Sequence, residues 1–228
     1  MGFSRNSKKQ KMSQWVAWLS GHWNRRMRTG VAALALFTCV LIAFGTQADQ
    51  LKDADAALAR KDYETAIAIL SELADAGNAE ASLKLGSMYL YGNGVVQDVE
   101  KGERLLRVAA DAGDSEARYR LGLCHVTQRL CPQDLGEARR WLELAAMQGY
   151  SPAQLDLAQL GWMLGDTDDR ISALKWVLIV LKQPPESIDM VRIERARSLR
   201  DRFMQELSSD QIEAARSAAA QFAVRPTK

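Results

Sequence analysis

The sequence repeats itself with a period of 36 residues, and no other feature restricts the possible folds as strongly. A shift by one period places Gly86 on Gly122 and Asp98 on Asp134. Further small or apolar residues coincide in the same way: Ala81 with Ala117, Leu85 with Leu121, Gly102 with Ala138, Ala109-Ala110 with Ala145-Ala146, and Gly113 with Gly149. A fixed period between about 20 and 50 residues is typical of solenoids, in which copies of one supersecondary unit stack.

The repeat extends beyond these two copies. A third copy begins at Ala153 and loses one residue before Trp176 corresponds to Trp141. Upstream, Asp62 and Ala66 match the second half of the unit. We therefore expect repeats over residues 49–183, with units at about 50–78, 79–114, 115–150 and 151–183.

Each unit is expected to contain two helices. Ala81, Leu85 and Met88 recur at the spacing of one helical face. Gly92-Asn93-Gly94 then ends the first helix, and Asp98 is a candidate N-cap for the second. No stretch shows the sustained alternation of a strand, so we expect an all-α fold built from αα-hairpins.

Past Pro184-Pro185 the repeat ends, and residues 184–224 are expected to form capping helices. Residues 186–207 fit one helix, and Ser208-x-x-Gln211 is a capping-box signature that opens a last one. The end of a solenoid needs a cap with a polar outer face. We assign the arginines of the first capping helix to that solvated face, with a basic docking site as the alternative: Arg192, Arg195, Arg200 and Arg202.

The N-terminal segment differs in character from the rest. Residues 1–28 carry seven basic residues and no acidic one, and residues 29–48 contain the apolar run from Val31 to Phe44. Because positively charged flanks stay in the cytoplasm, this pattern predicts that residues 49–228, the body of the protein, are exported.

The leader fits either a cleaved signal peptide or an uncleaved anchor. Thr46-Gln47-Ala48 offers a cleavage site, and a start at Met27 would give a signal peptide of ordinary length. We favour a single-pass inner-membrane anchor, because Trp15, Trp18 and Trp23 suit a membrane interface.

The basic N-terminal segment, residues 1–48, offsets the net negative charge of residues 49–228 in the charge of the whole chain. Residues 49–228 hold 23 of the 30 Lys and Arg residues but all 28 Asp and Glu residues. Phosphate binding requires clustered positive charge, which a mildly acidic body lacks. We therefore expect no nucleic-acid partner.

The best-formed copy resembles the Sel1-like repeat, a relative of the tetratricopeptide repeat, whose pattern is A-x-x-x-L-G-x-x-Y-x-x-G-x-G-V, then D-x-x-x-A, then A-A-x-x-G. Gly102 stands where this pattern has Ala, and the next copy has His125, Gln128 and Leu130 for Tyr and the two turn glycines. The resemblance implies a right-handed αα-superhelix that serves as a protein-interaction scaffold, and it implies an exported bacterial adaptor or regulator. The matching residues are Ala81, Leu85, Gly86, Tyr89, Gly92, Gly94, Val95, Asp98, Ala109, Ala110 and Gly113.

In such a superhelix the first helix of each unit lines the concave face. One row on these helices is unusually apolar for a solvent-facing surface, and we predict a partner site there, formed by Tyr119, Leu123, Leu155, Gln159 and Trp162. Tyr119 and Trp162 are the leading candidates because aromatic residues dominate binding hot spots. Lateral packing between neighbouring first helices is the alternative. The implied partner is a protein or peptide of the cell envelope.

Cys124 and Cys131 are the only cysteines of the body. The equivalent positions in the preceding unit are Met88, on the core side of its helix, and Val95, where the chain folds back over that helix. We predict a disulfide that ties a loop lacking both turn glycines, with two free buried thiols as the alternative.

No catalytic motif is visible. Gly92-Asn93-Gly94 follows a helix where a dinucleotide loop would follow a strand, and Cys124, His125 and Cys131 supply only three of the four ligands that zinc sites usually need. We expect no enzyme activity, cofactor, metal or small-molecule substrate, and we predict a non-catalytic scaffold or regulatory adaptor. The alternative is an accessory repeat region of a cell-envelope hydrolytic or lytic enzyme.

Overall fold

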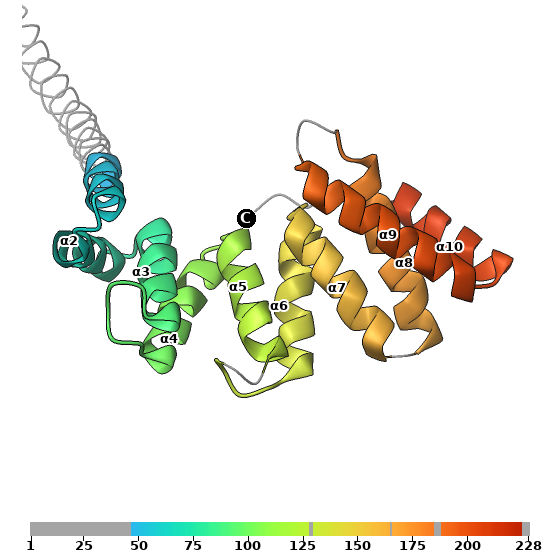
Figure 1. Cartoon of the computed structure of the whole chain (residues 1–228), viewed down its shortest axis with the longest axis horizontal. Coiled ribbons are helices and arrows are strands. Elements are labelled where there is room, and N and C mark those ends of the chain that lie inside the picture. The colour runs from blue at the N-terminus through green and yellow to red at the C-terminus, as the bar shows by residue number, and fades with distance from the viewer. Residues whose placement is uncertain (1–46, 128–129, 165, 185–187, 225–228) are drawn as a thin grey trace, which may run out of the picture. The chain divides into compact units, whose positions relative to one another are not determined.

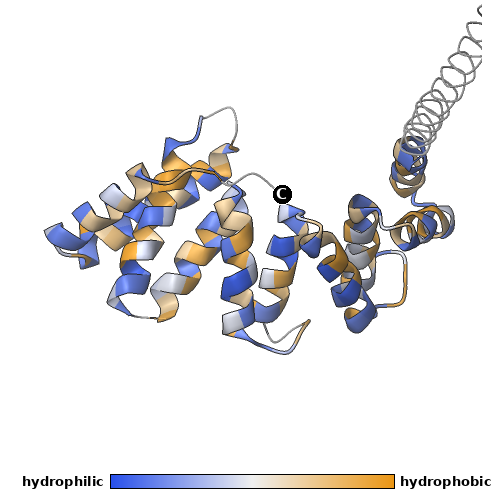
Figure 2. Ribbon diagram, turned by 180° about the vertical axis from the view of Figure 1, so that it is seen from behind, coloured by the Kyte–Doolittle hydropathy of each residue, from blue (hydrophilic) through white to orange (hydrophobic). Residues whose placement is uncertain are grey.

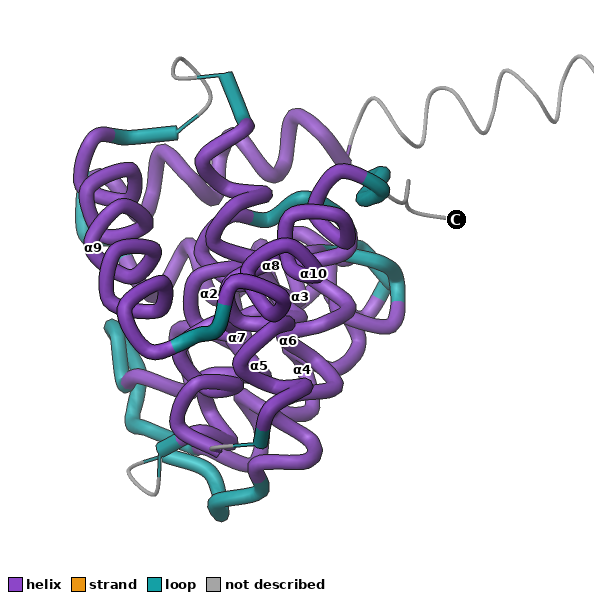
Figure 3. Tube along the Cα trace, turned by 90° about the vertical axis from the view of Figure 1, so that its right-hand side faces the viewer, coloured by secondary structure: helices purple, strands orange, loops and turns teal. Residues whose placement is uncertain are grey.

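The computed structural model describes residues 47–127, 130–164, 166–184 and 188–224, and within these ranges it contains helices and no strand (Figures 1 and 3). This confirms the all-α prediction. Residues 47–59 are helical. The helices that follow are α2 (Tyr63–Asp75), α3 (Ala79–Tyr91), α4 (Val99–Asp111), α5 (Ser115–Val126), α6 (Leu135–Met147), α7 (Ser151–Leu164), α8 (Thr167–Lys182), α9 (Met190–Glu206) and α10 (Ser209–Ala220).

The chain divides into two compact units, residues 1–53 and residues 54–228. Of the first unit the structure describes residues 47–53, which are helical. The basic segment 1–28 and residues 29–46 of the expected anchor lie outside the described residues. Among the helices of the described ranges, none has the length and apolar character needed to cross a membrane.

The second unit is a stack of helical hairpins in chain order. Helix α3 packs on α4, α5 on α6 and α7 on α8, and the hairpins join through α4 with α5 and α6 with α7 (Figure 1). The first helices of successive hairpins begin at Ala79, Ser115 and Ser151. Their starts are therefore one sequence period apart, as expected of a solenoid of αα-hairpins.

Local signals in the sequence start and stop these helices. The side chains of Asp98 and Asp134 accept hydrogen bonds from the third backbone N–H of α4 and of α6, each at 2.9 Å. These bonds satisfy N–H groups that have no partner within the helix. Gly92 ends α3 with φ at +71°, in the left-handed region that glycine adopts without strain.

Helices α3 and α4 approach each other through two glycines. A Cβ on Gly86 would lie 3.0 Å from the carbonyl oxygen of Gly102, and a Cβ on Gly102 would lie 2.7 Å from the backbone nitrogen of Leu90. The glycine at position 102, which departs from the family pattern, thus has a packing reason. Gly86, which recurs as Gly122 one period later, has the same packing reason.

The last two helices, α9 and α10, pack against α8 and cover the end of the hairpin stack. In Figure 2, hydrophobic and hydrophilic residues alternate along the ribbons of the helices. Phe203 of α9 stacks on Trp162 with ring centroids 4.0 Å apart, and Phe222 meets the edge of Trp176 at 5.4 Å. Ser208 and Gln211 form the expected capping box at the start of α10.

Candidate functional site

The predicted partner row divides into a buried part and an accessible part. Leu155 is fully buried and Trp162 is 8% exposed, whereas Tyr119 and Leu123 are half-buried and Gln159 is exposed. Trp162 lies under Phe203 of α9, so the expectation that Trp162 and Leu155 line an open face is wrong. Both side chains are packed, but Trp162 packs against the capping helix α9 and not against a neighbouring first helix, so lateral packing between first helices stays a prediction. Sequence periodicity alone gave no sign that a capping helix covers the end of the row.

The accessible part of the row borders an apolar groove of about 320 Å³. Its walls come from the C-terminal end of α5, from α7, and from the start of α6 with the segment before it. Several lining side chains are strongly exposed, with Met163 at 75%, Leu164 at 43% and Leu135 at 36%. The residues that line the groove are Leu123, Val126, Gln133, Leu135, Asp156, Gln159, Leu160, Met163 and Leu164.

A polar network centred on Asp156 borders this groove. The Tyr119 hydroxyl donates a hydrogen bond to Oδ2 of Asp156 at 2.8 Å, and Nη2 of Arg195 contacts Oδ1 at 2.6 Å. The same guanidinium donates to Oε1 of Gln159 at 2.7 Å. Asp156 therefore links α5, α7 and α9 and holds one wall of the groove in place.

Burial, reinforced by the negative charge of Asp156, raises the pKa of the Tyr119 phenol. The phenol therefore stays protonated and keeps donating to Asp156 over the whole neutral range.

The predicted assignment of the α9 arginines to a solvated outer face is wrong for Arg195. Its side chain is 40% exposed but turns to Asp156 and Gln159 on α7, so it belongs to the rim of the groove. Sequence reasoning also missed Asp156 itself. The sequence does show an acidic residue in an apolar helix one turn before Leu160. Nothing in the sequence identifies its hydrogen-bond partners Tyr119 and Arg195, which lie 37 and 39 residues away in the chain.

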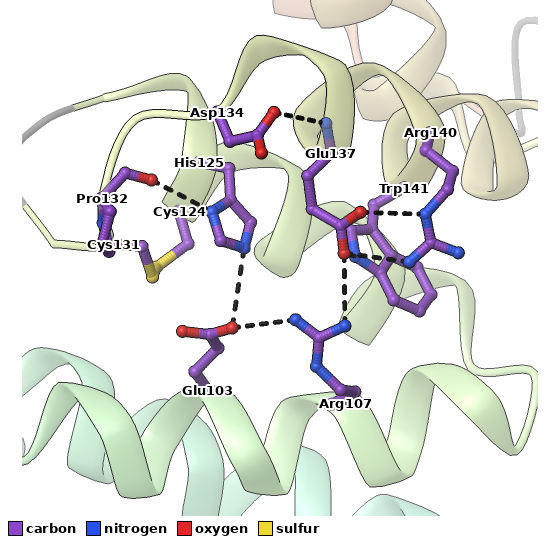
Figure 4. Close-up of polar contacts among 10 residues, drawn as sticks. All are labelled: Glu103, Arg107, Cys124, His125, Cys131, Pro132, Asp134, Glu137, Arg140 and Trp141. Carbon is purple, nitrogen blue, oxygen red and sulfur yellow. Dashed lines mark hydrogen bonds and ion pairs between the residues drawn. A yellow bond between two sulfur atoms is a disulfide. The ribbon is translucent and has the colours of Figure 1, made fainter.

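A second cluster lies at the C-terminal end of α5. Cys124 and Cys131 form a disulfide in the structure, with their Cα atoms 5.2 Å apart and both side chains buried (Figure 4). His125 is 7% exposed, and its Nδ1 lies 3.2 Å from the carbonyl oxygen of Pro132. Nε2 of the same ring lies 3.7 Å from Oε1 of Glu103 on α4.

Charged residues link this cluster to α6. Arg107 contacts Oε1 of Glu103 at 2.9 Å and Oε1 of Glu137 at 3.2 Å. Glu137 also accepts from Arg140 and, at 2.8 Å, from the indole N–H of Trp141 (Figure 4). The hydrogen bonds from Arg140 and then from Trp141 and Arg107 outweigh the effect of burial and lower the pKa of Glu137 to about 2.

The stacked hairpins and the exposed apolar groove define an α-solenoid of the kind that serves as a protein–protein interaction scaffold. Residues 79–114 and 115–150 each match the family model described as Sel1 repeat. The chain therefore contains two segments similar to Sel1 repeats, and such repeats generally mediate protein–protein interactions.

One solved structure supports the fold. A protective antigen present in uropathogenic Escherichia coli strains, described as displaying an SLR fold, is 24% identical with a TM-score of 0.59 and is matched over 70% of this chain. This chain spans 32% of that protein, so about a third of its length.

Two further matches have lower scores. A Sel1 repeat protein from Oxalobacter formigenes is 28% identical over 57% of this chain and 95% of its own, with a TM-score of 0.48. The MamA protein is 20% identical over 79% of this chain and 98% of its own, with a TM-score of 0.46. No curated protein matches the chain.

Proposed function

We propose that this protein is a non-catalytic scaffold or regulatory adaptor that binds an envelope protein through the groove between α5 and α7. The observation that carries the proposal is the exposure of Met163, Leu164 and Leu135 around one hollow. Solvent-exposed apolar side chains that line one concave surface favour association, because a partner removes them from water. The solenoid supports a rigid surface of this kind.

The chemistry of the groove indicates the kind of partner. Its floor and walls are aliphatic or thioether side chains, and its polar lining consists of Gln133, Asp156 and Gln159. An amphipathic helix or short peptide can insert two or three apolar side chains and place its polar face on this rim. Met163 suits such a contact because its flexible thioether adapts to the shape of the partner.

The location of the body is the second part of the proposal. A basic segment before an apolar run supports an inner-membrane anchor with the repeats in the periplasm, or a cleaved signal peptide with the same final compartment. An alkaline-phosphatase fusion after Gln50 tests this. High phosphatase activity is expected, and low activity together with a functional cytoplasmic reporter at the same position would contradict it.

Photo-cross-linking in living cells tests the groove. A photoreactive amino acid at Leu164 is expected to yield a discrete protein adduct, and Met163→Glu is expected to abolish it. The matched control is the same label at Val108, which is 48% exposed on α4 and lies outside the groove. Equal adducts from both positions, or an adduct that survives Met163→Glu, would place the partner elsewhere.

A further inference from the structure

The cluster at the end of α5 contains a buried histidine nitrogen with no explained role. His125 is 7% exposed, and among the described residues no hydrogen-bond partner lies within reach of its Nε2. The nearest carboxylate oxygen, Oε1 of Glu103, is 3.7 Å away, which is too far for a hydrogen bond. An unsatisfied buried polar atom destabilises the folded state, so its retention calls for an explanation.

The other nitrogen of the ring determines which atom is available. Nδ1 lies 3.2 Å from the carbonyl oxygen of Pro132, and a carbonyl oxygen only accepts hydrogen bonds. Nδ1 therefore carries a proton, and Nε2, the atom that binds a metal when it is unprotonated, faces Glu103 and Cys131. A histidine that donates one N–H to a backbone carbonyl and offers its other nitrogen is the usual arrangement of a metal ligand.

The atoms around Nε2 are ligands of suitable types. Nε2 of His125, a carboxylate oxygen of Glu103 and Sγ of Cys131 all lie within 4.8 Å of one another (Figure 4). Ligand atoms on one tetrahedral Zn²⁺ lie about 3.3–3.8 Å apart, so a contraction of about 1 Å brings these three to that geometry. Arg107 contacts Glu103 at 2.9 Å and orients its carboxylate.

Glu103 is the fourth ligand, which the sequence did not identify beside Cys124, His125 and Cys131. Cys124 is bonded to Cys131, so reduction of the disulfide releases two thiols beside His125 and Glu103. We propose that the reduced form of this protein binds one Zn²⁺ through Cys124, Cys131, His125 and Glu103, and that the disulfide and the metal exclude each other. Thiolate, imidazole and carboxylate together are a donor set that zinc accepts.

The conversion of the disulfide form to the zinc-bound form takes two steps. A dithiol reductant breaks the Cys124–Cys131 bond, transfers two electrons and two protons to the sulfur atoms, and is itself oxidised to a disulfide. Zn²⁺ then displaces the two thiol protons, which pass to solvent, and binds the thiolates. Oxidation by a disulfide reverses the sequence and releases the metal.

Metal titration of the whole 228-residue protein tests the proposal. Reduced, oxygen-free protein is titrated with Zn²⁺ against a chromophoric chelator, and with Co²⁺ to detect thiolate-to-metal charge transfer. We expect one metal ion per reduced chain, the charge-transfer band with Co²⁺, and no comparable binding by the disulfide form. Zn²⁺ is also expected to slow reoxidation of the two thiols. Weak or substoichiometric binding by the reduced chain, or equal binding by the disulfide form, would overturn the site.

Single substitutions assign the ligands. Glu103→Gln and His125→Gln are each expected to weaken Zn²⁺ binding by at least about tenfold. Glu137→Gln is the matched control, because Glu137 belongs to the same charge network but not to the cluster. Circular dichroism checks that each variant is folded. If His125→Gln does not fold, because the histidine is buried, the result with Glu103→Gln tests the site. Unchanged affinity in folded Glu103→Gln refutes the four-residue site.

Discussion

Replacement of Gly102 by alanine tests how closely α3 and α4 pack. The added Cβ would lie 2.7 Å from the backbone nitrogen and 3.0 Å from the Cα of Leu90, and 2.9 Å from the carbonyl oxygen of Gly86. All three neighbours are backbone atoms, so no side chain can rotate away and the two helices must separate. Overpacking of this kind costs about 1–3 kcal/mol.

The same substitution gains helix propensity, and the difference between the two effects sets the expected result. Alanine in place of glycine inside a helix stabilises by roughly 0.5–1 kcal/mol. We therefore expect Gly102→Ala to lower the free energy of unfolding by about 1–2 kcal/mol, or the Tm by about 2–8 °C for a domain of this size.

Thermal and urea unfolding followed by circular dichroism measure the effect, with Gly136→Ala as the control. Gly136 lies in the first turn of α6, and among the described residues the one atom near its hypothetical Cβ is Oδ1 of Asp134 at 3.3 Å. That variant is expected to be neutral or slightly stabilised. If Gly102→Ala is as stable as Gly136→Ala, the close approach of α3 and α4 is refuted.

Three further predictions concern the site and its network. The double variant Cys124→Ala/Cys131→Ala lacks the disulfide between two cysteines seven positions apart. Its free energy of unfolding in urea should be lower than that of wild type by about 2–3 kcal/mol. Stability equal to that of wild type would indicate free thiols in the native protein. Asp156→Ala removes the acceptor that Tyr119 and Arg195 share and should lower the free energy of unfolding by about 1–3 kcal/mol. Asp156→Asn keeps a side-chain oxygen and should lose less stability than Asp156→Ala. Equal losses in the two variants would contradict the role of Asp156 as a hydrogen-bond acceptor. The pKa of Glu137 is depressed to about 2 in the folded state, so the stability that this carboxylate contributes is present above its unfolded pKa of about 4.3 and is lost as the pH falls towards 2. Glu137→Gln should therefore be about 1 kcal/mol less stable than wild type at pH 7 and equally stable near pH 2. A stability difference that persists at pH 2 would refute the stabilising role of the Glu137 carboxylate.

The parts of the fold that follow from local chemistry could be predicted from the sequence. Asp98 and Asp134 cap their helices because a side-chain oxygen three residues before a backbone N–H needs no distant partner. Gly92 and the Ser208 capping box act in the same local way. The 36-residue period then establishes which residues of successive helices share a face.

The site depends on contacts between elements far apart in the chain, and these could not be predicted in the same way. Trp162 looked like an accessible hot spot because periodicity ignores the end of the array, where Phe203 covers it. Arg195 and Glu103 were missed for the same reason, since α9 and α4 bring them to Asp156 and His125. Leu123 and Gln159 do line the groove, where Gln159 accepts a hydrogen bond from Arg195 of α9.

The affinity of the cross-linked partner for groove variants tests the central claim most directly. The partner identified through Leu164 is titrated calorimetrically into wild type, Met163→Glu and the control Val108→Glu, whose side chain is exposed on α4. A charge on the exposed apolar wall should weaken binding by at least about tenfold, because the carboxylate must be desolvated against apolar partner groups. The account predicts that loss for Met163→Glu and wild-type affinity for Val108→Glu. Equal affinity of all three proteins would contradict the claim that this groove is the interaction surface.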